Sequence, residues 1–532
     1  MPGVEALGLL GFLVCVHLPI LALCQPLVAR LVGSPAGATA LADLAWPSGR
    51  QLDLLGASLE VSLAATGMAG LLGLLAALSS RPRGRLLRGL PLALVAVPPY
   101  VHALAWSTVL FRVETTLRGL GLAIELPRSG PGVTAWVMAM SRLPLTYGMA
   151  AIALGLLPDA PIEAARSVRS DRAVLLRIAI PLAAPIAAAG LALAFLLSLL
   201  DYGVPALFQV NVLALGVFAD YSASGDAARA LAMAMPLVVL AAGACLALVA
   251  GWRRAALSQP RGDGHPTWIA LLPRGLRGLS GLAMALVLLQ AAALCAGLFV
   301  AAGSPARILA ALLPARGDLI YSLSVALGAS LLALGPALAL AGRLAAGEGR
   351  GMRRTLLWLA TLLPLAVPAP LFGIGLIALW RGGPLAALLP LSAATLPVLA
   401  SAGRFAPLAA VLLTAQLLRR DPSLVDAARM HQAGVLQGWW QVGLPLLGPG
   451  LLAAAGLVFT LALGELGATL MVLPPGRSTL TARTFNYLHY GASEAVAGAC
   501  LVLALATVLV ATVVLQAFAA GQGMARGSEG LS

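Results

Sequence analysis

Charge is scarce in this chain of 532 residues. Charged side chains make up 10% of it, whereas an ordinary soluble domain carries about a quarter. Hydrophobic residues make up 60%, and the mean hydropathy is +0.95. Apolar runs that can cross a bilayer as helices of about 20 residues recur along the chain. The composition therefore excludes a soluble globular domain and predicts an all-α polytopic membrane protein.

Motifs for chemistry on a substrate are also missing. The chain has no GxxxxGK[ST] loop, so we expect it not to bind ATP. The sequence contains no HExxH, GxSxG or paired-carboxylate pattern, so we expect neither an enzyme nor a cofactor. The cysteines lie within apolar runs without CxxC or Cys/His spacing, so neither a disulfide framework nor a metal site is implied. They are Cys15, Cys24, Cys245, Cys295 and Cys500.

Lysine is absent, so arginine carries nearly all of the positive charge behind the net charge of +14. The arginines are spread through short loops rather than gathered in one patch. We therefore expect no nucleic-acid partner and interpret the excess as a signal of membrane topology.

The apolar runs predict about twelve transmembrane helices, six in each half of the chain. Residues 6–28 are predicted to be a retained first helix rather than a signal peptide, because no basic segment precedes them. A basic segment, 253–277, is the predicted linker between a first half, 1–252, and a second half, 278–532. The other spans are predicted near 57–79, 89–111, 133–157, 182–201, 230–252, 278–302, 321–342, 355–380, 388–415, 447–472 and 495–519.

Two polar, charged segments interrupt the apolar chain at matching places in the two halves. The first runs from Glu163-Ala164-Ala165-Arg166 to Pro181, and the second from Asp426-Ala427-Ala428-Arg429 to Pro445. An acid near a helix start complements the helix dipole, and paired alanines leave a face that another protein can cover. We interpret loops 161–181 and 424–445 as docking elements; the alternative is an interfacial helix that only connects spans.

Further matches extend the repeat. Ser58 corresponds to Ser322, and the Ala-Val-Pro sequence that ends at Pro98 corresponds to the one that ends at Pro368. Asp201-Tyr-Gly corresponds to Glu465-Leu-Gly. Because six spans is an even number, both halves would enter the membrane from the same side as parallel repeats.

The distribution of arginine predicts the orientation. If the N-terminus lies inside the cell, most arginines fall in cytoplasmic loops, as positive charge does in membrane proteins. Both acid-Ala-Ala loops are then cytoplasmic as well.

The acid-Ala-Ala loops resemble the coupling loops of ABC importer permeases, which dock on a cytoplasmic ATPase. The second loop ends in Val442-Gly-Leu-Pro445 as in that family, whereas the first ends in Ile178-Ala-Ile-Pro181. Arg169 and Gln432 stand where the family has glycine. Within the permeases that fuse both halves, the segment from Gly464 to Thr484 is most similar to the iron(III) importers.

This resemblance implies a permease that forms the solute pathway in the bacterial inner membrane, with ferric iron as the expected solute. It also implies a cytoplasmic ATPase dimer and a periplasmic or extracellular solute-binding protein as partners, besides the lipid bilayer. Thiamine, polyamine and phosphonate permeases remain alternatives. A secondary transporter driven by an ion gradient is the alternative from a different class.

Intramembrane charges and prolines mark candidate positions along the pathway. Asp201 and Glu465 lie near the ends of equivalent spans, where a carboxylate needs water or a partner. The alternative is that each caps a helix end or pairs with a neighbouring helix. Pro98 and Pro368 interrupt equivalent helices and either line the pathway or form packing kinks. Arg142 and Arg404 are expected to be buried in pairs or to reach the membrane surface, Glu60 to be structural or interfacial, and Tyr202 to be an interfacial aromatic.

Overall fold

The computed structural model describes residues 2–33, 39, 43, 45, 49–79, 91–122, 124–157, 159–257, 272–346, 351–380, 392–418, 443–490 and 493–527. These ranges are helical, with short turns and no strand. Within these described ranges, ten helices are long and apolar enough to cross a membrane, and an eleventh span is obtained if one bent helix pair is counted. The chain is therefore an all-α, multi-pass membrane protein, as predicted.

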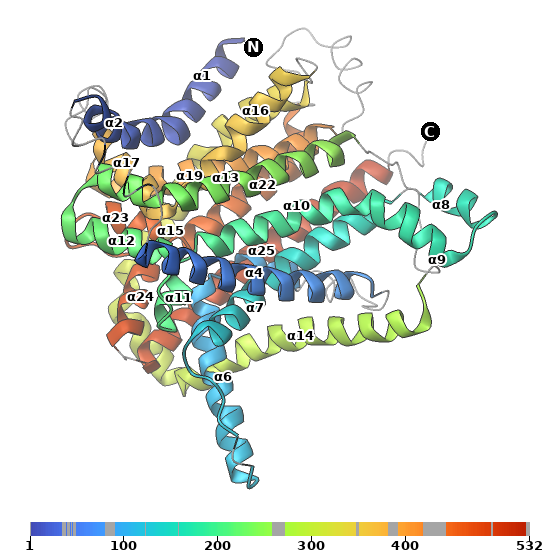
Figure 1. The fold of residues 1–532 in the computed structure, drawn as a ribbon, viewed down its shortest axis with the longest axis horizontal. Coiled ribbons are helices and arrows are strands. Elements are labelled where there is room, and N and C mark those ends of the chain that lie inside the picture. Colours follow the sequence, from blue (N-terminus) through green and yellow to red (C-terminus); the bar gives the residue numbers. More distant parts are fainter. Residues whose placement is uncertain are drawn as a thin grey trace.

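The first part of the chain begins with α1 (Pro2–Phe12), which continues through a π-helical turn into α2 (Leu18–Gly33). A later unit, α8 (Asp159–Arg166), stands apart from the long helices at one end of the bundle. We call this end the α8 end, and the other the far end (Figure 1). The remaining helices are α4 (Arg50–Ala77), α6 (Pro99–Gly119), α7 (Pro131–Gly155), α9 (Asp171–Val174), α10 (Ile180–Leu199), α11 (Gly203–Leu207), α12 (Leu213–Ser224) and α13 (Ala227–Leu257).

The second part has a similar succession of elements. Its helices are α14 (Arg274–Ala302), α15 (Pro305–Ala345), α16 (Met352–Leu362), α17 (Ala369–Trp380), α19 (Leu396–Leu418), α22 (Leu444–Leu463), α23 (Gly467–Val472), α24 (Leu480–Tyr490) and α25 (Ser493–Gly527).

Packing partners also correspond between the two parts. Helix α4 packs on α7 and α15 on α19, whereas α10 packs on α13 and α22 on α25. Between the parts, α6 crosses α14 and α17 crosses α2. Each part therefore holds the first long helix of the other, so the two parts form one bundle.

The third, fifth and ninth predicted spans differ from the structure. The predicted third span, 89–111, is not among the candidate spans in the described residues. There Pro98, with an extended backbone, separates a 3-10 turn at Leu94–Ala96 from α6. The predicted fifth span, 182–201, begins earlier, because α9 runs through a π-helical turn into α10 and gives one span, Asp171–Leu199. The predicted ninth span, 355–380, is bent by 100° between Ala366 and Ala369.

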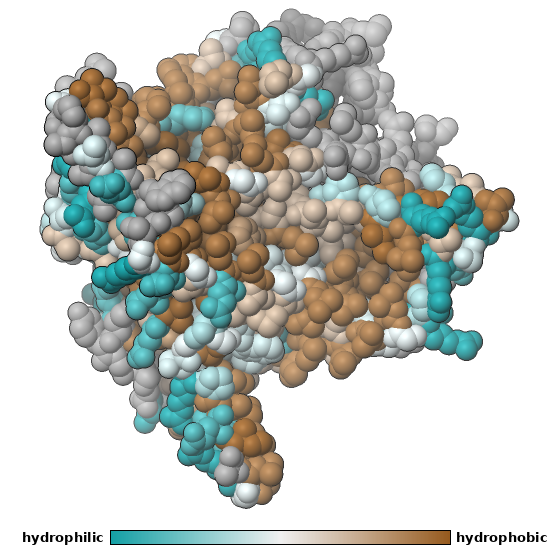
Figure 2. Space-filling model, viewed as in Figure 1, coloured by the Kyte–Doolittle hydropathy of each residue, from teal (hydrophilic) through white to brown (hydrophobic). Residues whose placement is uncertain are grey.

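The outside of the bundle is apolar, as expected of a surface that faces lipid. Leu282 and Leu289 on α14 and Leu331 on α15 are each at least 60% exposed. Figure 2 shows apolar side chains across the middle of one face and hydrophilic side chains over α8 and α9. The long helices thus lie along the membrane normal, between the α8 end and the far end.

Candidate functional site at two broken helices

Two helices break after equivalent spans, and an acid stands in each break. Helix α10 ends at Leu199 before Asp201, and α22 ends at Leu463 before Glu465. A helix start leaves backbone N–H groups without intrahelical acceptors. Asp201 Oδ1 accepts hydrogen bonds from the N–H groups of Gly203 (2.9 Å) and Val204 (3.3 Å). Glu465 Oε1 accepts one from Ala468 (2.8 Å), so each acid caps the short helix that follows.

Each acid also pairs with an arginine from an equivalent helix. Arg142 Nη2 on α7 lies 3.1 Å from Asp201 Oδ2, and Arg404 Nε on α19 lies 3.4 Å from Glu465 Oε2. The four side chains are between 7% and 19% exposed, and Arg142 also donates to the Leu197 carbonyl at 3.0 Å. Pairing neutralises charges that would be costly to bury alone. The capping and pairing alternatives are thus both realised, and the expected burial of the two arginines in pairs is confirmed.

Tyr202 links the two breaks. Its ring stacks on Phe218 at 5.3 Å and meets the edge of Phe485 from the second part at 6.4 Å. A methyl group at Gly467 would lie 3.3 Å from Tyr202 Cε1, so the absence of a side chain there leaves room for the ring. The side chain is only 4% exposed, and its hydroxyl has no hydrogen-bond partner among the described residues. The expectation of an interfacial aromatic was wrong for Tyr202.

The predicted proline breaks lie against the same junction. A methyl group at Gly464, next to Glu465, would lie 2.7 Å from Pro98 Cγ. One at Gly467 would lie 2.5 Å from Cβ of Ala369, the residue that follows Pro368. The structure therefore gathers the pathway candidates Asp201, Glu465, Pro98 and Pro368 around one junction, where Pro98 packs through its ring and Pro368 is placed by the contact of the residue after it.

Other polar groups at the junction were not singled out as site residues in the sequence. Tyr100 donates from its hydroxyl to Thr481 Oγ1 at 3.2 Å, and Thr481 donates to the Leu463 carbonyl at 2.7 Å. Ser58 Oγ accepts from the Leu213 N–H at 2.8 Å, and Ser322 Oγ accepts from the Leu480 N–H at 2.7 Å. The Ser58 and Ser322 match was visible as part of the repeat. Tyr100 and Thr481 gave no signal, because their contact joins distant parts of the chain.

The junction offers little to a metal ion. Among the described residues there is no group of three or more His, Cys, Asp and Glu side chains that could hold one. The two carboxylates each have an arginine beside them, so each pair is neutral.

The first predicted docking loop forms α8 and the turn after it. Ile162 is fully buried and anchors α8, whereas Glu163, Ala164 and Arg166 are exposed and Ala165 is half-buried. Arg166 pairs with Asp171 at 3.2 Å across the turn. Pro181 is exposed in the first turn of α10. In the second loop, Asp426, Ala427, Ala428 and Arg429 lie outside the described residues, and Pro445 is in the first turn of α22.

The fold and the junction define a multi-pass helical membrane protein with two broken helices, each of which holds a buried ion pair and which meet through Tyr202 and Phe485. No protein-family model matches the sequence. The chain is 32% identical over 160 residues to a Salmonella typhimurium protein provisionally named 2-aminoethylphosphonate transport system permease protein PhnV. Proteins of the same name from Salmonella choleraesuis and Salmonella paratyphi A match at the same identity. In each case the match covers 29% of this chain and 58% of the relative.

Proposed function

We propose that this chain is the membrane permease of an ATP-binding-cassette importer. The observation that carries the proposal is the similarity over 160 residues to transport-system permeases. The acid-Ala-Ala-Arg sequence exposed on α8 supports it, since such a helix is free to dock on a separate ATPase. The matching packing of the two parts supports two parallel six-helix halves in one polypeptide. The distribution of arginine favours a cytoplasmic position for both docking loops, at the inner membrane.

In this proposal the junction of the broken helices is the gate of the solute pathway. It lies at the far end of α10, one membrane span away from α8. Closure of an ATPase dimer against the two loops would move the halves relative to one another. Parting the halves would separate Tyr202 from Phe485, whereas each acid would keep the arginine of its own half. The gate would then open without leaving a buried charge unpaired.

The first experiment measures ATP hydrolysis in proteoliposomes with the cognate ATPase. We expect Glu163→Ala combined with Asp426→Ala to lose ATPase binding or coupled hydrolysis. Asp53→Ala, at the start of α4 and therefore predicted to lie on the opposite side, is the matched control and should keep both. Transport that follows an imposed ion gradient without any ATPase would replace this proposal with the secondary-transporter alternative.

For the solute we propose a small zwitterionic phosphonate. The relatives carry the name of 2-aminoethylphosphonate, which has one ammonium and one phosphonate group. The paired Asp201–Arg142 and Glu465–Arg404 groups offer both signs of charge to such a molecule. Ferric iron, the solute implied by the sequence resemblance, prefers several oxygen ligands, and the described junction has two carboxylates that are already paired.

Uptake into proteoliposomes with the cognate binding protein distinguishes these solutes. We expect accumulation of 2-aminoethylphosphonate and none of ferric iron. Uptake of iron, thiamine or a polyamine in its place would disprove the phosphonate assignment and leave the permease proposal standing.

A further inference from the structure

Helix α6 leaves the bundle halfway along its length. Val101, His102, Ala103 and Ala105 are all buried, whereas Phe111 and most residues after it are exposed. In Figure 1, α6 runs across the direction of α4, α10 and α14 and projects beyond them. We call residues 111–122, the end of α6 and its exit, the arm. A transmembrane helix does not explain the arm, because it lies across the bundle axis.

The depth of the arm follows from its crossing of α14. At Gly297 the two helices touch closely, since a methyl group there would lie 2.6 Å from the Ala105 carbonyl and 3.1 Å from Val109 Cγ2. Helix α14 starts at the α8 end, where Leu272 packs with Ile162, and it ends at Ala302. From Gly297 to Ala302 the helix rises about 7.5 Å. Helices that lie in a membrane surface bury their apolar face by a similar amount, about 5–10 Å.

The arm is amphipathic, and its apolar side is turned toward the depth of the bilayer. Val113, Leu117 and Leu120 recur at helical spacing on one side, and Val113 and Leu120 are 43% and 72% exposed. Thr115 and Arg118 are exposed on the other side. Figure 2 shows the projecting part apolar along the edge turned toward the α8 end and hydrophilic along the opposite edge. The apolar edge thus faces the depth of the bilayer, and the polar edge faces away from it.

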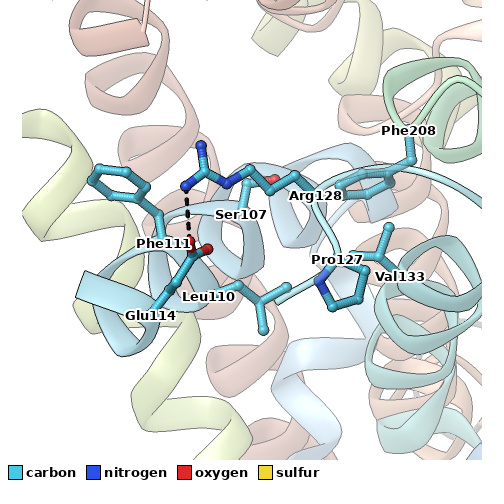
Figure 3. A pocket seen from close by; sticks show the side chains of 8 residues that line it. All are labelled: Ser107, Leu110, Phe111, Glu114, Pro127, Arg128, Val133 and Phe208. Atoms are coloured by element: carbon cyan, nitrogen blue, oxygen red, sulfur yellow. Dashed lines mark hydrogen bonds and ion pairs between the residues drawn. The ribbon is translucent and has the colours of Figure 1, made fainter. Parts of the chain in front are cut away.

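The arm is held in place by charges at its base. Glu114 is 3% exposed at its side chain and pairs with Arg118 at 2.7 Å and Arg128 at 3.2 Å. The hydrogen bond from Arg128 holds the pKa of Glu114 below its ordinary value. Arg128 also lies 5.4 Å from the centre of the Phe111 ring, and Figure 3 shows both around a small pocket of about 110 Å³. The Gly130 N–H donates to the Phe208 carbonyl at 2.9 Å, which ties the returning segment to the loop after α11.

We propose that the arm lies in the interfacial layer of the membrane at the far end, with its apolar side among the acyl chains and its arginines near lipid phosphates. The lipid-facing surface of α14, with Leu282, Leu289 and Phe299 all more than half exposed, continues directly to the crossing. Arg112 is exposed, and Arg118 and Arg128 are 51% and 63% exposed, so all three have donors available for phosphate oxygens. The arm would then fix how deep the nearby gate sits, because Gly130 and Phe208 connect it to α11.

The test measures the depth of single labelled positions in nanodiscs. Val113→Cys and Leu120→Cys place a bimane label on the apolar side, and Thr115→Cys places it on the polar side as the matched control. The signal of the labelled parent chain, which keeps its five cysteines, is subtracted. Phosphatidylcholine carries a quencher either on the headgroup or near the start of the acyl chain.

We expect acyl-chain quenching to exceed headgroup quenching by about twofold or more at positions 113 and 120, and the reverse at 115. Equal, weak quenching from both lipids at all three positions would overturn the proposal and leave the arm in water. Labels at 113 that are shielded from both lipids but lie close to each other in pairs would overturn it in favour of a second copy of the chain. Each variant is first checked for the elution volume of the parent, so that a misfolded variant is not scored.

Discussion

The two broken helices carry the same device with different side chains. At the first break the short Asp201 caps two N–H groups and holds Arg142 at 3.1 Å, with both side chains about one-eighth exposed. At the second, the longer Glu465 caps one N–H group and holds Arg404 at 3.4 Å. Both breaks therefore need a cap and an ion pair. The break leaves backbone N–H groups without acceptors, and the buried acid that caps them needs a positive charge beside it.

What differs between the breaks lies next to the acids. Tyr202 follows Asp201 and reaches across to Phe485, whereas Leu466 follows Glu465. Duplicated polar groups therefore maintain the frame of the junction, and an unduplicated aromatic fills its centre. If the junction selects the solute, we expect Tyr202, the residue that is not duplicated, to contribute to that selectivity.

The largest effect is expected from breaking one ion pair. Arg142→Ala leaves Asp201 buried without its cation and should lower the free energy of unfolding by about 3–5 kcal/mol. Arg404→Ala should cost less, since its pair is longer and Arg404 is 19% exposed. Denaturant titration in detergent measures both.

A double variant separates loss of a pair from loss of packing. Arg142→Leu combined with Asp201→Leu removes both charges and should cost less than Arg142→Ala alone, although the caps at Gly203 and Val204 are lost too. A double variant that is less stable than the single one would mean that the lost ion pair and caps together outweigh the cost of the orphaned charge.

The next effect concerns the equivalent glycines that start the short helices. Gly467→Ala should cost about 1–3 kcal/mol, because the new methyl group meets Ala369 Cβ at 2.5 Å. Gly203→Ala is the matched control, since its nearest neighbour would be 3.6 Å away. It should leave stability unchanged or raise it by up to about 1 kcal/mol. If Gly467→Ala changes the free energy of unfolding as little as Gly203→Ala does, the residues around Gly467 move to make room for the methyl group.

Much of this comparison was visible in the sequence. Asp201 and Glu465 were predicted as equivalent acids, and Arg142 and Arg404 were predicted either to be buried in pairs or to reach the membrane surface, because charges in an apolar chain stand out and their order repeats. The direction of the chain after Pro98 was not predictable, since hydropathy records length and apolarity but not where a bent helix points. For the same reason the sequence predicted a span at 89–111 where the structure has the base of α6. The prediction for Tyr202 was wrong because the sequence around an aromatic residue at the end of a span is the same whether its ring faces lipid or the centre of the bundle.

Smaller and equal effects are expected at the matched serines. Ser58 and Ser322 each donate to a carbonyl one turn earlier, those of Leu54 and Asp318, and accept from the N–H that starts a later helix. Alanine at either site leaves a buried N–H without an acceptor and should cost about 1–2 kcal/mol. Thermal unfolding of the two variants should agree within about 0.5 kcal/mol if the halves are equivalent there. Cysteine in place of serine keeps a weak acceptor and should recover part of the loss.

The smallest effect on stability, and the most informative one, is expected at the unduplicated residue. Tyr202→Phe keeps the stacking on Phe218 and removes a hydroxyl that has no partner in the described residues, so unfolding should change by less than about 0.5 kcal/mol. Tyr202→Leu, which copies Leu466, removes both aromatic contacts and serves as the positive control, at about 1–3 kcal/mol. If Tyr202→Phe is as stable as the parent but slows solute uptake, the hydroxyl acts on the solute when the gate opens. If Tyr202→Phe leaves both stability and uptake unchanged, only the aromatic ring distinguishes the first break from the second. Other residues must then recognise the solute.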